Sequence, residues 1–333
     1  MPTQFSLTDR DDRRHSLNDN PLARESLIFI LFIPEEDIGI IAYTWVDGES
    51  KAGAMGLVFG RDNDRITQFH VEGVEVPRDA DFDQWTVGPM TVRHGEPHKR
   101  ARVTFEHDGV ELDYSFEATT PAFTYHDNRD GCPSWLADNR LEQSGLATGT
   151  LRIGEREIAF DTTGHRDHSW GQRDWTAIHQ YRWVNVQVGS DVAINFLEGS
   201  ALDQHYDLGY VDRDGEQSPI VRVEVDIERD LEHFSYTSAR FVILDELDRT
   251  TEVVADHRDA LAVWPAGGLQ SHDAGGPCTV DGLPGRIHIE EGWHPEFVER
   301  RKAMLSEKFD SEESRTALSV NKGVGILDAS LTR

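Results

Sequence analysis

Residues 164–175, which read GHRDHSWGQRDW, hold an unusually dense set of reactive side chains for a chain of 333 residues. Two imidazoles, two guanidiniums, two carboxylates, two indoles and a hydroxyl lie within this segment. Such groups are costly to bury, and an ordinary solvated loop has no physical reason to collect them. We therefore predict that this segment contains the functional site.

Alternation along an extended chain divides this segment into two faces. Arg166, His168 and Trp170 share one face, and the residues between them share the other. A histidine beside an indole, with carboxylates nearby, can act as a general acid or base near neutral pH. We predict that His168 is the catalytic group and that Asp167 or Asp174 orients it. Trp170 is predicted to form its apolar wall.

The same residues also allow a structural interpretation. Arg166 with Asp174, and Arg173 with Asp167, can form ion pairs that fix a junction between two domains. In that case the tryptophans belong to the core. Arg166, Arg173 and Asp174 are accordingly predicted as structural clamps.

A metal site is a weaker alternative. His165 and His168 have the spacing H-x-x-H, but on a strand their rings face opposite ways, so shared coordination needs a loop conformation and a distant third ligand. Ser169 is a poor candidate nucleophile because the chain around it lacks a G-x-S-x-G elbow. We predict neither a metal ion nor a cofactor.

The elements around the motif have the pattern of antiparallel β-structure. In residues 110–118 apolar and polar side chains alternate with period two, and the same alternation recurs in residues 181–188. Asp-Gly turn signals separate such runs about every ten residues. Pro295–Phe309 has the spacing of a short amphipathic helix, and the glycine-rich residues 266–285 are predicted to be a loop.

Composition excludes several classes of partner. The chain has 61 Asp and Glu against 33 Lys and Arg, a formal charge of -28, which repels nucleic acid and anionic membrane surfaces. Its most apolar run, residues 27–33, is far shorter than the about 20 residues of a membrane span. Cys132 and Cys278 are too few and too far apart for a disulfide framework. A cytoplasmic protein is expected.

Segment 164–171, with EQSG at 142–145 before it and RDW at 173–175 after it, resembles the tandem lipocalin-like superfamily. That superfamily contains the carotenoid 1,2-hydratases (hydroxyneurosporene synthases), the AttH-like proteins and fungal Diels–Alderases of related fold. The resemblance is specific over residues 140–200 and architectural elsewhere.

The resemblance implies an all-β fold of two consecutive lipocalin-like or calycin-like antiparallel barrels or half-barrels, with the motif at their junction and an apolar cavity for a lipophilic guest. In the hydratases the matching His and Trp lie where a carbon–carbon double bond is protonated, with an acid in support. Carried over, these residues are His168, Trp170 and Asp167. An indole face stabilises the resulting carbocation by about 1–2 kcal/mol when desolvated.

The expected function is that of a cofactor-independent hydratase, dehydratase or isomerase acting on a hydrophobic isoprenoid, steroid-like or polyketide molecule. The alternative is a non-catalytic carrier of a lipophilic ligand. Four residues in and after the motif are predicted to contact the substrate: Trp175, Tyr181, Gln187 and Asn195. The predicted organisation is a flexible segment at 1–20, β domains at 21–175 and 176–310, and a tail at 311–333.

Overall fold

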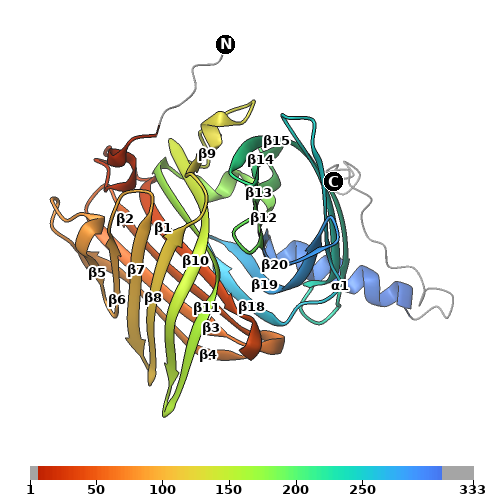
Figure 1. Ribbon diagram of the computed structural model, residues 1–333, viewed down its shortest axis with the longest axis horizontal. Coiled ribbons are helices and arrows are strands. Elements are labelled where there is room, and N and C mark those ends of the chain that lie inside the picture. The colour runs from red at the N-terminus through yellow and green to blue at the C-terminus, as the bar shows by residue number, and fades with distance from the viewer. Residues whose placement is uncertain (1–6, 310–333) are drawn as a thin grey trace.

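The computed structural model describes residues 7–309, which are almost entirely β-structure followed by one helix (Figure 1). The strands form two antiparallel sheets, one from each half of the chain, and each sheet curls into a barrel. The predicted fold class is therefore confirmed. The helix α1 (Pro295–Phe309) has the predicted bounds.

The first barrel has the strand order β4-β3-β2-β1-β11-β10-β8-β7-β6-β5, with β9 beside β10. Its edge strands β4 and β5 are not paired with each other in the described structure, so this barrel is nearly closed. The strands are β1 (Ala23–Ile33), β2 (Ile38–Asp47), β3 (Lys51–Phe59), β4 (Arg65–Glu75), β5 (Trp85–Val87), β6 (Met90–His94), β7 (Arg100–His107), β8 (Val110–Ala118), β9 (Phe123–Thr124), β10 (Asn139–Ile153) and β11 (Arg156–Gln172).

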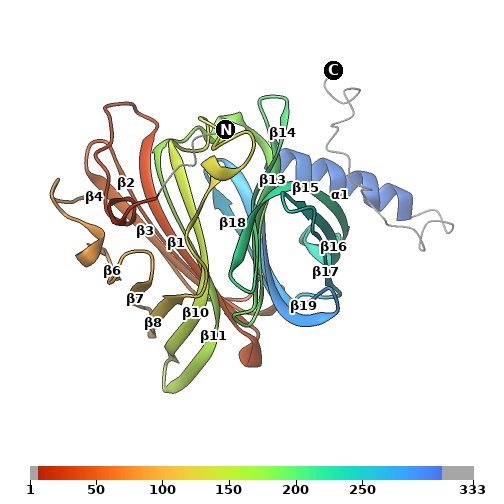
Figure 2. The same cartoon turned by 45° about the horizontal axis from the view of Figure 1, so that its top comes forward.

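The second barrel has the order β17-β16-β15-β14-β13-β12-β20-β19 and is closed by pairing of β17 with β19, while β18 extends the sheet beyond β19. The two barrels lie side by side (Figure 2). The strands are β12 (Ile178–Val188), β13 (Val192–Ala201), β14 (Gln204–Arg213), β15 (Glu216–Arg229), β16 (Tyr236–Asp245), β17 (Thr250–Ala255), β18 (Ala260–Ala266), β19 (Leu269–Val280) and β20 (Leu283–Trp293).

The uninterrupted apolar run at residues 27–33 lies in β1, which is buried on both of its faces. Leu27, Phe29 and Leu31 point into the core of the first barrel. Ile28 and Ile30, which alternate with them, pack in a second apolar cluster shared with residues of the second barrel. A strand buried on both faces has no polar side to present, so its sequence loses the usual alternation.

The glycine-rich residues 266–285 were predicted to be a loop, and this prediction is wrong, because β19 and the start of β20 pass through them. Gly275 shows the physical reason. A Cβ atom there would lie 2.2 Å from the ring of Phe32 in β1. Glycine within a strand often marks such a close approach, and here it lets the two barrels come into contact.

Residues 7–20 differ from the flexible segment expected at 1–20. They include the short 3-10 turn η1 (Asp9–Asp12) and pack against the first barrel, where Asp12 is only 1% exposed. The chain passes from the first sheet to the second between the end of β11 and the start of β12. Residues 1–6 and the tail predicted at 311–333 lie outside the described residues.

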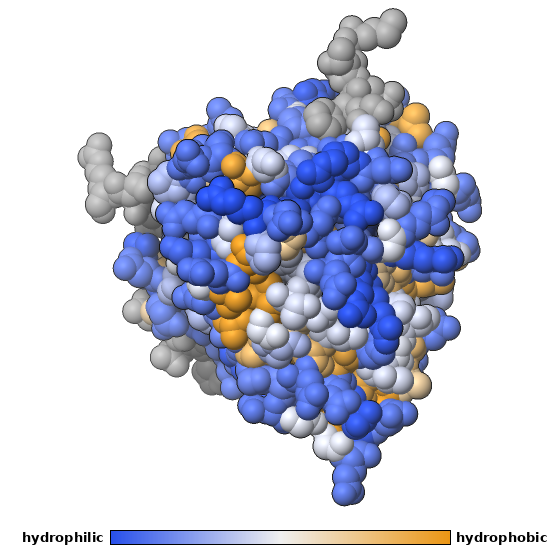
Figure 3. Space-filling model, turned by 90° about the vertical axis from the view of Figure 1, so that its left-hand side faces the viewer, coloured by the Kyte–Doolittle hydropathy of each residue, from blue (hydrophilic) through white to orange (hydrophobic). Residues whose placement is uncertain are grey.

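The surface agrees with the composition. The face shown in Figure 3 is mostly hydrophilic, with smaller hydrophobic areas between the polar side chains. Within residues 7–309, the structure has no helix with the length and apolar character that crossing a membrane requires.

Candidate functional site

The motif lies within β11, which continues to Gln172 and so keeps alternate side chains on opposite faces. Arg166, His168 and Trp170 point into the first barrel, and their contacts are with its core and with the N-terminal segment. The intervening residues point towards the second barrel. The division predicted from alternation is confirmed, and it gives the motif two separate environments.

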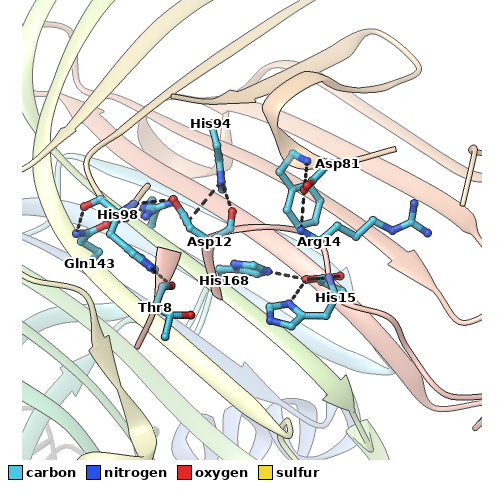
Figure 4. Close-up of polar contacts among 12 residues, drawn as sticks. Thr8, Asp12, Arg14, His15, Asp81, His94, His98, Gln143 and His168 are labelled. Atoms are coloured by element: carbon cyan, nitrogen blue, oxygen red, sulfur yellow. Dashed lines mark hydrogen bonds and ion pairs between the residues drawn. The ribbon is translucent and has the colours of Figure 1, made fainter. Parts of the chain in front are cut away.

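On the first-barrel face, His168 is fully buried and its Nε2 lies 2.8 Å from Oε1 of Glu25. The same oxygen lies 2.8 Å from Nδ1 of His15, whose ring stacks on Trp170 with centroids 3.8 Å apart. Figure 4 shows His15 and His168 approaching from different parts of the chain. Asp167, the predicted partner of His168, lies on the opposite face and does not contact it.

The ion pairs predicted for the clamp residues do not form. Arg166 pairs instead with Asp12, at 2.8 Å between Nη1 and Oδ1. Arg173 donates to the hydroxyl of Ser169 and to a backbone carbonyl. Asp174 lies beyond the end of β11 and accepts a hydrogen bond from Thr176 N, capping the turn η6 (Trp175–Ala177). Extended geometry sends Arg166 into the barrel, out of reach of Asp174.

On the face towards the second barrel, Arg140 of β10 lies between two carboxylates. Its Nε is 2.5 Å from Glu142 and its Nη2 is 2.6 Å from Asp167. The other oxygen of Glu142 lies 2.8 Å from Nε2 of His165, and Trp183 of β12 donates to Glu142 at 3.1 Å. This buried network joins the two barrels.

The second barrel contributes a matching histidine and carboxylate. His288 Nε2 of β20 lies 3.0 Å from Oδ1 of Asp273 on β19. The other oxygen of Asp273 accepts hydrogen bonds from Trp264 and Ser271, which hold the carboxylate in place. Rings of both His165 and His288 contact Trp183, with centroid separations of 5.5 and 5.9 Å.

A small cavity lies between the barrels, with about 30 Å³ of space accessible to water. Its apolar lining comprises Ile30 and Phe32, which pack in the cluster between the barrels, and Leu31 and Ile287, whose side chains belong to the two barrel cores. Its polar lining comes from both barrels and comprises Thr162, Thr163, His165, Asn185, Gln187, Arg286 and His288. Two histidines with carboxylate partners thus line one cavity.

The predicted substrate-binding residues are distributed over the junction. Gln187 lines the cavity, and its amide also donates to Gly145 O. Asn195 is buried nearby and donates to Asn185. Tyr181 donates to Glu290, and Trp175 packs over the β18–β19 turn. Of these four predicted residues, only Gln187 lines this cavity.

Burial shifts the proton affinities of several acids in this network. Burial, with Glu142 nearby, raises the pKa of Asp167 to about 7 even though Arg140 opposes the shift. Burial and the neighbouring Asp273 raise the pKa of Glu290 to about 8. Burial also lowers the pKa of His165, against the opposing effect of Glu142. Titration close to neutral pH is what proton transfer requires.

Metal coordination shared by His165 and His168 is incompatible with the geometry, since their rings lie on opposite faces of β11. A different set, His15, Glu25 and His168, brings one potential ligand atom from each residue within 4.8 Å of the others.

Several residues of the site were not singled out from the sequence. Glu25 stands just before the apolar run of β1, and Arg140 is the second residue of β10, the strand that carries Glu142. His288 and Glu290 alternate with apolar neighbours in β20, so period two places them on one face of that strand. The alternation of polar and apolar residues was visible in the sequence, but alternation alone does not show that the outer face of β20 packs against another barrel.

Comparison with known proteins places the chain in a family. The family model described as Domain of unknown function (DUF7064) matches residues 8–295. The chain belongs to the DUF7064 family. No curated protein matches this DUF7064 chain.

Solved structures resemble the DUF7064 chain in fold. One, described as an AttH (NE1406) from Nitrosomonas europaea, is 12% identical with a TM-score of 0.56, and the match covers 84% of this chain and 97% of that one. CghA with Sch210972 is 13% identical with a TM-score of 0.55, covering 82% and 89%. CghA without this compound is 13% identical with a TM-score of 0.55, and the match covers 82% of this chain and 88% of that one. The AttH-like resemblance thus holds for the fold, and nothing in it is specific to carotenoid hydratases.

Proposed function

We propose that this chain is an acid–base enzyme, a hydratase, dehydratase or isomerase, which acts on a hydrophobic small molecule at the junction of the two barrels. One observation carries the proposal: His165 and His288, each bonded to a buried carboxylate, line the same interdomain cavity. A carboxylate behind an imidazole fixes its tautomer and orientation, as in known acid–base sites. The second nitrogen of each ring, Nδ1, contacts Ser144 Oγ at 3.0 Å in His165 and Asn185 Nδ2 at 3.4 Å in His288. Proton transfer to a substrate therefore requires that these side chains move aside or relay the proton, with one histidine giving a proton and the other accepting one.

Proton supply near neutral pH supports this assignment. Asp167 and Glu290, whose pKa values burial raises to about 7 and about 8, hold protons that ordinary carboxyls would have lost. Arg140 lies within ion-pair distance of Asp167 and links it to Glu142 and so to His165. A neutral carboxyl kept in a buried site can act as an acid at physiological pH.

The cavity lining favours a substrate that is mostly apolar. Ile30 and Phe32 of β1 turn hydrocarbon surface towards the junction, and polar groups of both barrels complete the lining. The structure of CghA with Sch210972 supports binding of a small molecule within this fold. Ligand sites usually need about 300–1,000 Å³, so side chains such as Phe32 must move to admit a substrate.

His168 has a different place in this proposal from the one first predicted. It lies on the first-barrel face of β11, bonded to Glu25 and buried among aromatic rings. It does not line the interdomain cavity. Proton transfer is therefore assigned to His165 and His288, and His168 to holding the N-terminal segment in place.

The test is a turnover screen with three compounds: a linear polyene isoprenoid, a steroid and a cyclic polyketide. The products are separated by chromatography and identified by mass spectrometry. Wild-type protein is expected to add or remove one water, or to isomerise a double bond, in one of these classes. His288→Asn should lower that turnover at least about 100-fold, as for loss of a positioned acid or base. His257→Asn, on an exposed histidine, is the matched control.

Binding of a compound that is always recovered unchanged would refute the enzymatic proposal and favour a carrier. Full activity of His288→Asn would remove this residue from the mechanism.

A further inference from the structure

We propose that His15, Glu25 and His168 form a binding site for a divalent transition-metal ion of the zinc type, which fastens the N-terminal segment to the first barrel. His15 Nδ1 and His168 Nε2 each lie 2.8 Å from Oε1 of Glu25, and all three atoms lie within 4.8 Å of one another. Two imidazoles and one carboxylate are a donor set that zinc accepts, with a fourth position left for water. Small shifts would bring these atoms to coordination distance.

The charge balance around Glu25 favours a bound cation. Its side chain is fully buried, yet no Arg or Lys of residues 7–309 lies within ion-pair distance of it. Other buried carboxylates, such as Asp12 and Glu142, each have an arginine partner. Arg14 attracts Glu25 only over a longer range, because its guanidinium donates to the carbonyls of residues 77 and 80 and to a serine hydroxyl. The side-chain partners of Glu25 are instead the rings of His15 and His168, so a cation held by all three groups would compensate the buried charge while both rings are neutral.

The surroundings of the three residues hold Glu25 in place and enclose the two rings. Backbone N of His15 donates to both oxygens of Glu25, at 3.0 and 2.9 Å, which fixes the carboxylate. The other ring nitrogen of His15 lies 3.7 Å from a carboxylate oxygen of Asp11, which is an ion-pair contact, while the other ring nitrogen of His168 is buried without a hydrogen-bond partner among the described residues. Trp170 stacks on His15, and Phe82 meets the ring of His168 edge-on. These rings limit access of water.

The three ligands also explain why an ion would matter to the fold. Glu25 is in β1 and His168 in β11, adjacent strands of the first barrel. His15 belongs to the segment that runs across this barrel towards β1 (Figure 4). One ion would therefore cross-link the segment to two strands and hold it in place.

Binding is tested on tag-free protein that has been treated with EDTA and dialysed. Zn²⁺ is then added and quantified by elemental analysis, and Co²⁺ is used as a spectroscopic substitute. Wild-type protein should bind one Zn²⁺ per chain and give the strong visible absorption of tetrahedral Co²⁺. His15→Ala and Glu25→Gln should weaken Zn²⁺ binding at least about 100-fold, since each removes one of three ligands.

His70→Ala, on an exposed histidine outside the cluster, should bind Zn²⁺ like the wild type. Trypsin cleavage after Arg13 and Arg14 should slow at least tenfold when Zn²⁺ is added to the wild type and stay unchanged in His15→Ala. His15 lies on the N-terminal segment, so its substitution leaves the barrel strands intact even if Glu25→Gln fails to fold. Absence of stoichiometric Zn²⁺ binding, or equal affinity in His15→Ala, would overturn the proposal.

Discussion

Glu290 offers the sharpest quantitative test of the buried network, because replacing it with glutamine should stabilise the protein. Its carboxyl is buried between the barrels and accepts a hydrogen bond from Tyr181. Burial and the neighbouring Asp273 raise its pKa from 4.5 to about 8. A glutamine of the same shape can still accept the tyrosine hydrogen bond, and it has no charge to bury.

The size of the effect follows from linkage. A carboxyl whose pKa is higher in the folded state favours folding only while it is protonated, so its contribution is complete below pH 4.5 and is lost as the pH rises through about 8. Each pKa unit corresponds to about 1.4 kcal/mol. Between pH 5 and pH 8 the wild type should thus lose about 3 kcal/mol through Glu290, and Glu290→Gln should not.

Denaturant unfolding of both proteins at pH 5 and pH 8 measures this difference. Glu291 is the matched control, because it is adjacent in β20 and points into the second barrel between Arg182 and Arg229. Burial opposes its ionisation, but Arg229 and Arg182 lower its pKa. Glu291→Gln should therefore destabilise at pH 8. A stability gap between wild type and Glu290→Gln that does not change with pH would refute the reasoning.

Two further substitutions test the ion pairs at the two faces of β11. Arg140→Met leaves Glu142 and Asp167 buried without their cation. The free energy of unfolding should fall by about 3–5 kcal/mol, and by less at pH 5 than at pH 8. Denaturant titrations at the two pH values measure this loss. Asp12→Asn removes the partner of Arg166 and should speed trypsin cleavage of residues 7–20 at least tenfold, as followed by mass spectrometry.

Each of these two predictions has an outcome that would contradict it. If Arg140→Met unfolds with the same free energy as the wild type, the buried carboxylates Glu142 and Asp167 do not depend on the charge of Arg140. In the wild type, burial disfavours the Asp12 carboxylate, but Arg166, His94 and the backbone N–H of His98 together outweigh burial and hold the pKa of Asp12 below its usual range. Its contribution is therefore present above about pH 4 and is lost in stronger acid. If trypsin cleaves Asp12→Asn and the wild type at equal rates at pH 7, other contacts hold residues 7–20 against the first barrel.

The fold could be predicted because its signals are local. Alternation in β8 (Val110–Ala118) and β12 (Ile178–Val188), with turns between strands, is a property of short sequence windows. The two faces of β11 followed from the same rule. The glycine-rich part of β19 misled the prediction because Gly275 is required by Phe32 of the other barrel, a contact 243 positions away along the chain.

The site was harder to predict because its partners come from distant strands. His168 and Glu25 are 143 residues apart, and His165 and His288 meet at a cavity formed by different barrels. Sequence neighbours such as Asp167 were the natural partners to propose for His168, but alternation turns them away from it. Only the packing of the barrels decides that the outer faces of β11, β12 and β20 form a buried junction.

Solvent deuterium incorporation is the most direct test of the claim that the junction transfers protons. The converted substrate class is incubated in deuterated water with wild type, His165→Asn and His168→Asn, and the product is analysed for carbon-bound deuterium. In the direction that protonates a double bond, we expect one carbon-bound deuterium per turnover in the wild type. The rate should fall at least about 100-fold in His165→Asn and stay within about tenfold of wild type in folded His168→Asn. Full incorporation by His165→Asn, with loss only in His168→Asn, would contradict the account and place the chemistry inside the first barrel.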